Sequence, residues 1–195
     1  MKIKTRTIRF FKSKLVISLL IALPIFLALS IGYYLVSYTG KKESKMRPKA
    51  AAATAPLSMS LPTGWSEEIS TQSNIVHKYV KDGITDIKPT VLIGKAELAD
   101  GNFKNFSDTV IRNFVSSINT WTIKKDDTIT NKTYTLRHLD GYFITGTRQV
   151  NVRQDIFAKG TQAYVVNAIW DPLEKETTIQ EIDTIMKEII ASLTR

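Results

Sequence analysis

An uncharged stretch of 22 residues, 15–36, constrains this chain more than any other feature of its sequence. At the helical rise of about 1.5 Å per residue, it is long enough to cross a hydrocarbon core of about 30 Å. Pro24 and Gly32 interrupt the stretch, and both residue types are tolerated in membrane helices. Tyr33 and Tyr34 lie near its end, where aromatic rings favour the headgroup region. The sequence therefore predicts a transmembrane helix over residues 15–36, with the lipid bilayer as its partner.

A cleaved signal peptide is the alternative interpretation. Its apolar region would span about 7–15 residues and would be followed directly by small residues. Here the apolar run is longer, and the residues around Tyr33 and Tyr34 make a poor cleavage site. The alanines at 50–53 offer a later site, but they lie well past the end of the run. We therefore expect an anchor that stays attached.

The positive charge of the chain belongs to its N-terminal segment. The formal net charge of +9 comes from 27 Lys and Arg residues against 18 Asp and Glu residues. Residues 1–56 contain eleven of the basic residues and one of the acidic ones, which leaves 16 basic and 17 acidic residues for 57–195. The domain after the linker is therefore nearly neutral, which excludes the class of globally basic nucleic-acid binders.

The distribution of basic residues also predicts a topology. Six precede the apolar stretch and five follow it, a small excess that favours a cytoplasmic N-terminus. We expect a bacterial single-pass protein of the plasma membrane. Its parts would be a basic tail (1–14), a transmembrane helix (15–36), a basic linker rich in Ala and Pro (37–57) and an extracytoplasmic domain (58–195). In the reverse topology, the linker would lie against anionic lipid.

Residues 58–195 show the alternation and turn signals of an antiparallel sheet. Three Asp-Gly pairs, at Asp82, Asp100 and Asp140, predict turns between apolar runs. Residues 162–170 are apolar on both faces, as expected of a central strand that is covered on both sides. The predicted strands are 58–61, 65–69, 75–81, 90–98, 121–129, 132–139, 142–150, 152–158 and 162–170.

Two stretches have the helical period. In 108–118 the apolar residues fall on one face, with Ser107 as the expected N-cap. In 179–193 they form one continuous stripe, and Thr178 and Glu181 have the spacing of a capping box. Such stripes must pack on something, most simply on the sheet. The predicted class is α+β, an antiparallel sheet flanked by helices in one domain.

Catalytic and metal-binding patterns are missing from the sequence. The two histidines, His77 and His138, have no ligand spacing between them, and Asp140 is expected to be a turn residue. No G-x-S-x-G elbow and no glycine-rich phosphate loop is present. The chain has no cysteine, which excludes disulfides and thiolate zinc sites and fits an exported bacterial domain. We therefore expect no catalytic, cofactor-binding or metal-binding residues and no cofactor.

Three further groups of residues have a structural and a functional interpretation. The Lys124–Asp127 run is expected in a solvated turn rather than in an acid/base pair. Arg148 and Arg153 flank a predicted turn and are expected to be exposed strand charges, with an anion site as the alternative. Trp121 and Trp170 are expected in the core.

Four features follow one another over residues 58–194: Leu61-Pro62-Thr63-Gly64-Trp65, the helix Phe106–Ile118, the strand AYVVNAIW at 163–170 and the closing IIASL at 189–193. In this order of elements the domain resembles the PsbP-like fold, a group of α/β/α sandwich domains. The resemblance implies a non-catalytic binding or assembly factor and transfers no functional residue. The expected function is a membrane-anchored domain that binds a protein or small molecule. A membrane-tethered hydrolase and an accessory subunit of an envelope or secretion complex remain alternatives.

Overall fold

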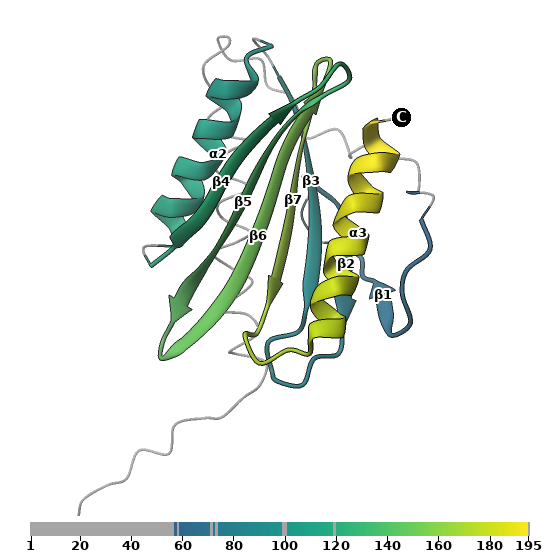
Figure 1. The fold of residues 1–195 in the computed structure, drawn as a ribbon, viewed down its shortest axis with the longest axis vertical. Coiled ribbons are helices and arrows are strands. Elements are labelled where there is room, and N and C mark those ends of the chain that lie inside the picture. Colours follow the sequence, from purple (N-terminus) through teal and green to yellow (C-terminus); the bar gives the residue numbers. More distant parts are fainter. Residues whose placement is uncertain are drawn as a thin grey trace, which may run out of the picture.

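The computed structural model describes residues 57, 59–70, 72, 74–98, 101–118 and 120–194 (Figure 1). The predicted tail and transmembrane helix, and all of the predicted linker except Leu57, lie outside the described residues. Among the described helices, none is both long enough and apolar enough to cross a membrane.

Seven strands form one antiparallel sheet, which confirms the predicted antiparallel class, although the sequence predicts nine strands. They are β1 (Trp65–Glu67), β2 (Ile75–Lys81), β3 (Thr90–Glu97), β4 (Thr122–Thr130), β5 (Thr135–Thr145), β6 (Arg148–Lys159) and β7 (Gln162–Trp170). Their order in the sheet is β1-β2-β3-β7-β6-β5-β4, and every neighbouring pair is antiparallel. The described residues 59–61 form no strand, so that part of the strand prediction is wrong.

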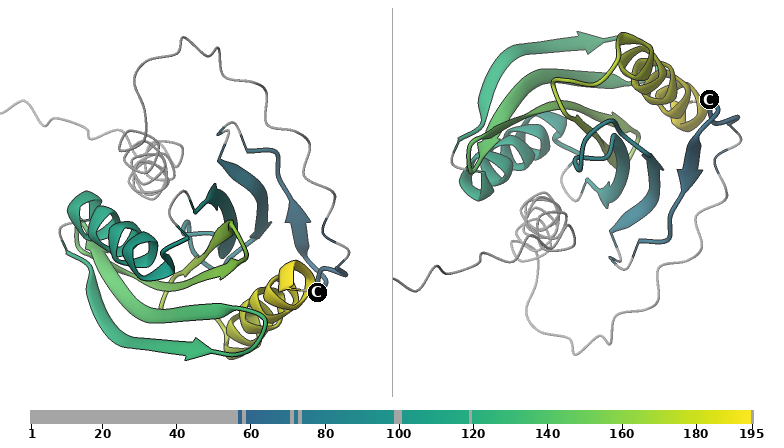
Figure 2. Two further views of the ribbon diagram at one scale, coloured as in Figure 1. Left: turned by 90° about the horizontal axis from the view of Figure 1, so that it is seen from above. Right: turned by 90° about the horizontal axis from the view of Figure 1, so that it is seen from below.

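The middle strand, β7, contributes side chains to two separate cores. Val165 and Ile169 belong to the core on one face of the sheet, whereas Val166 and Trp170 belong to the core on the other. A helix covers each face: α2 (Phe103–Ser117) and α3 (Glu176–Thr194) lie on opposite sides of the curved sheet (Figure 2). The predicted central strand and the predicted flanking helices are therefore confirmed.

Helix α2 begins five residues before the predicted start at 108. Its N-cap is Asn102, whose side chain accepts a hydrogen bond from the Asn105 amide at 3.0 Å. Ser107 lies inside the helix and is buried, and its hydroxyl donates to the Lys104 carbonyl at 3.1 Å. The predicted cap at Ser107 is therefore wrong. Because Asn102 caps the helix five residues before the predicted start, the first turn includes Phe103 and Phe106, which pack against the core on this face of the sheet.

Helix α3 spans the predicted range of 179–193 and extends it at both ends. Because the helix already begins at Glu176, Thr178 lies in its first turn rather than at its cap. The buried stripe consists of Thr178, Ile182, Ile185, Met186 and Ile189. This stripe packs on β3 and β7, the strands nearest to it in the sheet.

The predicted turn at Asp140-Gly141 is wrong, because β5 runs without interruption through both residues. The chain reverses instead at Gly146, whose φ of +62° favours glycine. A Cβ atom at Gly141 would lie 2.2 Å from the Thr122 carbonyl oxygen and 3.0 Å from Nε1 of Trp121. Glycine is therefore required here for the close approach of the neighbouring chain, not for a turn.

Strand β4 forms one edge of the sheet, and all nine of its residues are exposed. Its pairing with β5 shifts register between Ile123 and Lys125. The Lys124–Asp127 run lies in the middle of this strand, which confirms the predicted strand 121–129 and contradicts the predicted turn at the run, although the run is solvated as expected. Its charged side chains and its bulge are features that proteins use to keep an exposed edge from pairing with other chains.

The two cores predict a clear contrast between two aliphatic substitutions. Ile185 on α3 is 0% exposed, whereas Leu173, which precedes the helix, is 71% exposed. We expect Ile185→Ala to lower the free energy of unfolding by about 2–5 kcal/mol, because it leaves a cavity. Leu173→Ala should change it by about 0.5 kcal/mol or less. Urea unfolding followed by tryptophan fluorescence measures both values, and equal effects would contradict the assignment of α3 to the core.

Candidate functional site

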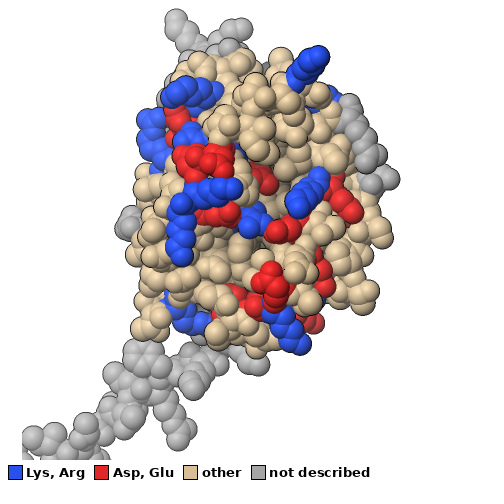
Figure 3. Space-filling view, in the orientation of Figure 1, with Lys and Arg blue, Asp and Glu red and all other residues tan. Residues whose placement is uncertain are grey.

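The face of the sheet on which α3 packs is called the α3 face here. Charged side chains occupy the part of this face that the helix does not cover. Along β5, His138 and Asp140 alternate with residues of the α2-side core, and along β6 Arg153 and Asp155 do the same. The strand register sets His138 opposite Asp155 and Asp140 opposite Arg153. Each cation therefore lies directly across from a carboxylate, and Figure 3 shows the mixture of positive and negative side chains on this face.

His138 is held between two carboxylates. Its Nδ1 lies 2.5 Å from Oδ1 of Asp155, and its Nε2 lies 3.0 Å from Oδ2 of Asp140. Hydrogen bonds to Asp140 and Asp155 raise the pKa of the imidazole from 6.5 to about 9. The ring is therefore protonated at neutral pH, and both of its nitrogens donate.

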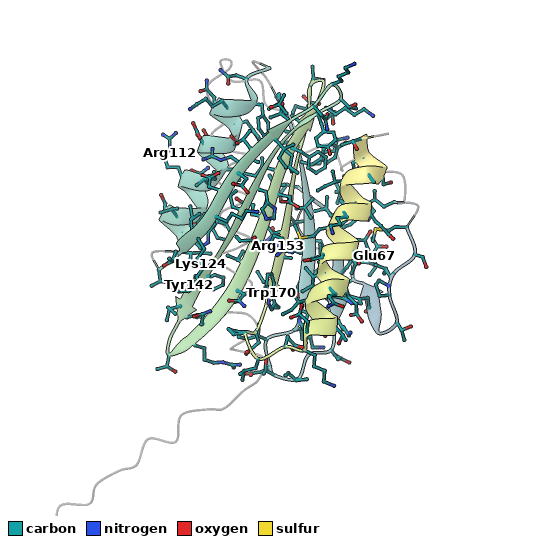
Figure 4. The ribbon with its side chains drawn as sticks, viewed as in Figure 1. Glu67, Arg112, Lys124, Tyr142, Arg153 and Trp170 are labelled. Atoms are coloured by element: carbon teal, nitrogen blue, oxygen red, sulfur yellow. The ribbon has the colours of Figure 1, made fainter. Side chains whose placement is uncertain are left out.

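Arg153 joins this cluster to the rest of the domain. Its Nε donates to Oδ1 of Asp140 at 2.7 Å, and its Nη1 donates to Asp183 on α3. The guanidinium carbon lies 5.8 Å from the ring centroid of Trp170, close enough for a cation–π contact (Figure 4). Burial alone would raise the pKa of Asp140, but hydrogen bonds from His138 and Arg153 outweigh it and lower the pKa to about 2.

A groove lies beside this cluster, between α3 and the hairpin that connects β4 to β5. Its volume is about 490 Å³, and it is open to solvent. Its lining residues are Thr133, Tyr134, Leu136, Lys187, Ile190, Ala191 and Thr194. Ile129 on β4 lies directly opposite Leu136 in the register and is 54% exposed, which extends the apolar floor toward the edge of the sheet.

The structure does not bring the two histidines together. Three strands, β3, β7 and β6, separate β2 from β5 in the sheet. The Nδ1 atom of His77 lies 2.7 Å from Oε1 of Glu67, and its ring stacks on Tyr79 with 6.0 Å between ring centroids. Among the described residues, no group of three or more His, Asp or Glu side chains is arranged so that it could hold a metal ion.

Arg148 and Arg153 do not flank a turn and do not share a site. Both belong to β6, and they contact different partners. Arg148 binds Asp86 at 2.5 Å and Asp171 at 2.6 Å, at the end of the sheet. Each arginine therefore has its own carboxylates, which leaves the two with no common place for an anion.

The tryptophans lie in the core, as predicted for two of them. Trp170 is buried, and Trp121 packs against the α2-side core with its ring 4.4 Å from that of Phe114. Trp65 is also buried, and its Nε1 donates to Oε2 of Glu181 at 2.8 Å.

Sequence reasoning missed both the charged cluster and the groove. The signal for the cluster was the alternation of polar residues in β5 and β6, which the predicted turn at Asp140 concealed. The signal for the groove was the spacing of Lys187, Ile190, Ala191 and Thr194, which lie three or four residues apart and thus on one side of α3.

Comparisons with known proteins identify no family. No family model matches the chain, and no curated protein matches it. Among solved structures, the chain is similar to PA94 from Pseudomonas aeruginosa, a protein of unknown function described as a putative regulator. The TM-score is 0.46 with 11% sequence identity, over 58% of this chain and 77% of that chain. A likeness of this size carries no argument about fold or function.

The carboxylates around His138 predict its titration. We expect its ring protons to titrate near pH 9 in the folded protein, as measured by NMR. Because the folded pKa lies above the unfolded value, His138 stabilises the fold fully below about pH 6.5 and loses this effect as the pH rises through 9. The difference in unfolding free energy between wild type and His138→Gln should therefore shrink over that interval. A midpoint near 6.5 would show that the carboxylates do not hold the ring.

Proposed function

We propose that this chain is a single-pass membrane protein whose C-terminal domain lies outside the cytoplasm and binds a partner without catalysing a reaction. The anchor rests on the uncharged stretch 15–36, and the orientation rests on the six basic residues before it. The observation that carries the binding role is the contrast on the α3 face. There the titratable side chains are paired with one another, whereas the neighbouring groove has an apolar floor that is open to solvent.

The geometry of His138 argues against the alternative of a hydrolase. A general base must be unprotonated near the operating pH, and it must reach the proton that it removes. The raised pKa keeps this imidazole protonated at neutral pH, and both of its nitrogens already lie against Asp140 and Asp155. A positioned carboxylate does occur in catalytic triads, but here a second one occupies the nitrogen that would face a nucleophile.

The order of elements supports the finer assignment to a PsbP-like sandwich. An antiparallel sheet with one helix on each face, and a closing helix that ends near Leu193, agrees with the arrangement that the resemblance implies. Fold alone does not specify a function, so the binding role rests on the groove.

The proposed topology is testable with introduced cysteines, because the chain has none of its own. We expect Thr184→Cys, on the exposed side of α3, to react with a membrane-impermeant maleimide in intact spheroplasts. Ser13→Cys, in the predicted tail, should react only after the membrane is permeabilised. The opposite pattern would reverse the orientation, and labelling of both positions would contradict the anchor.

The binding role is testable by photo-crosslinking in native cells. Benzoylphenylalanine would be placed at Thr133 in the groove and, as a matched control, at Arg112 on the exposed side of α2 (Figure 4). We expect irradiation of the full-length protein to give a discrete adduct from position 133 and none from position 112. Equal adducts from both positions, or no adduct from either, would contradict a partner site at the groove.

A further inference from the structure

Lys187 is an unpaired cation on the wall of the groove. It is exposed on α3, and the structure gives it no ion pair among the described residues. Asp183, one helical turn before Lys187, forms an ion pair with Arg153 and therefore does not pair with Lys187. Lys132 in the β4–β5 turn, next to the groove residue Thr133, is likewise exposed and without an ion pair among the residues described. The groove therefore presents positive charge beside an apolar floor.

The floor is aliphatic and aromatic. Leu136 and Ile190 line it from the sheet and from the helix, and Tyr134 adds an aromatic ring. Ile129 continues the apolar surface outward on β4. A ligand that matches this surface needs an aliphatic group for the floor and a negative charge for Lys187.

Two other occupants fit less well. Small-molecule sites bury most of their ligand in a concave pocket, whereas this groove is open to solvent. The chain's own linker carries five basic residues and one acidic residue between 37 and 57, so Lys187 would repel it. An extended peptide segment suits an open groove that runs beside a helix.

We propose that the groove between α3 and the β4–β5 hairpin binds a short acidic and aliphatic peptide segment of a partner protein. One carboxylate of the segment pairs with Nζ of Lys187, and a neighbouring aliphatic side chain packs on Leu136 and Ile190. The inference rests on the proposed binding function and adds the chemistry of the partner. It also implies binding that weakens with ionic strength, because the charges involved are exposed.

The test is a selection from a random dodecapeptide display library on the full-length protein in nanodiscs. We expect the wild type to enrich peptides in which Asp or Glu lies next to Leu, Ile or Val. Lys187→Glu should reverse the charge preference toward Lys and Arg, and it should weaken binding of the wild-type-selected peptides by about tenfold or more.

Lys175→Glu is the matched control, because Lys175 is also exposed and without an ion pair among the described residues but lies just before α3, away from the groove. This variant changes the net charge by the same amount and should keep the acidic preference and the affinity. The inference is overturned if the wild type enriches no acidic-aliphatic peptides, or if Lys187→Glu and Lys175→Glu have equal effects.

Failure of this inference is distinguishable from failure of the proposed function. An adduct from position 133 in cells, together with a library that shows no acidic preference, would leave the binding role intact and overturn only the chemistry of the partner. Absence of the adduct would overturn the binding role itself.

Discussion

A central strand that is apolar on both faces is the constraint on which the rest of this fold depends. β7 is the last strand in the sequence, yet it lies in the middle of the sheet, where it joins β1–β3 to β4–β6. Without it, these two sets of strands would be separate antiparallel pieces. Because its side chains enter both cores, each face needs its own cover, which α2 and α3 provide. The Asn167 amide in the middle of this strand faces the α2 side and accepts a hydrogen bond at 2.7 Å from Gln154, its partner on β6.

The charged cluster completes a face that one helix is too narrow to cover. α3 packs on β3 and β7, so the parts of β5 and β6 that it leaves uncovered on this side need side chains that tolerate water. Cross-strand pairs of opposite charge meet this need while they keep neighbouring strands in register. Arg153 then ties α3 to the cluster through Asp183. The groove is the space left between α3 and the β4–β5 hairpin, because a single helix does not cover the whole of this face of the sheet.

Much of the fold could be predicted from the sequence, and the errors have a common cause. The period of the apolar residues identified both helices, the central strand and the antiparallel class, because the side chains that a helix or strand buries recur along the sequence with that element's period. Asp140-Gly141 was misread because its pair of residue types is typical of turns. Here each residue serves a contact distant in sequence: Asp140 binds Arg153, and Gly141 makes room for the chain around Thr122. Such contacts have no local signature, so the polar alternation in β5 and β6 and the spacing along α3 do not by themselves show which residues meet in the cluster or at the groove.

The exposed edge at β4 has a consequence for crowding. A tether of the kind proposed here confines copies of the domain to two dimensions, where neighbours meet far more often than in free solution. A nine-residue strand with an open edge would then be a template for uncontrolled polymerisation. The bulge near Lys125 interrupts the regular spacing of backbone donors and acceptors that a second strand would need. The irregular edge thus allows dense packing on a surface without the sheets fusing into one.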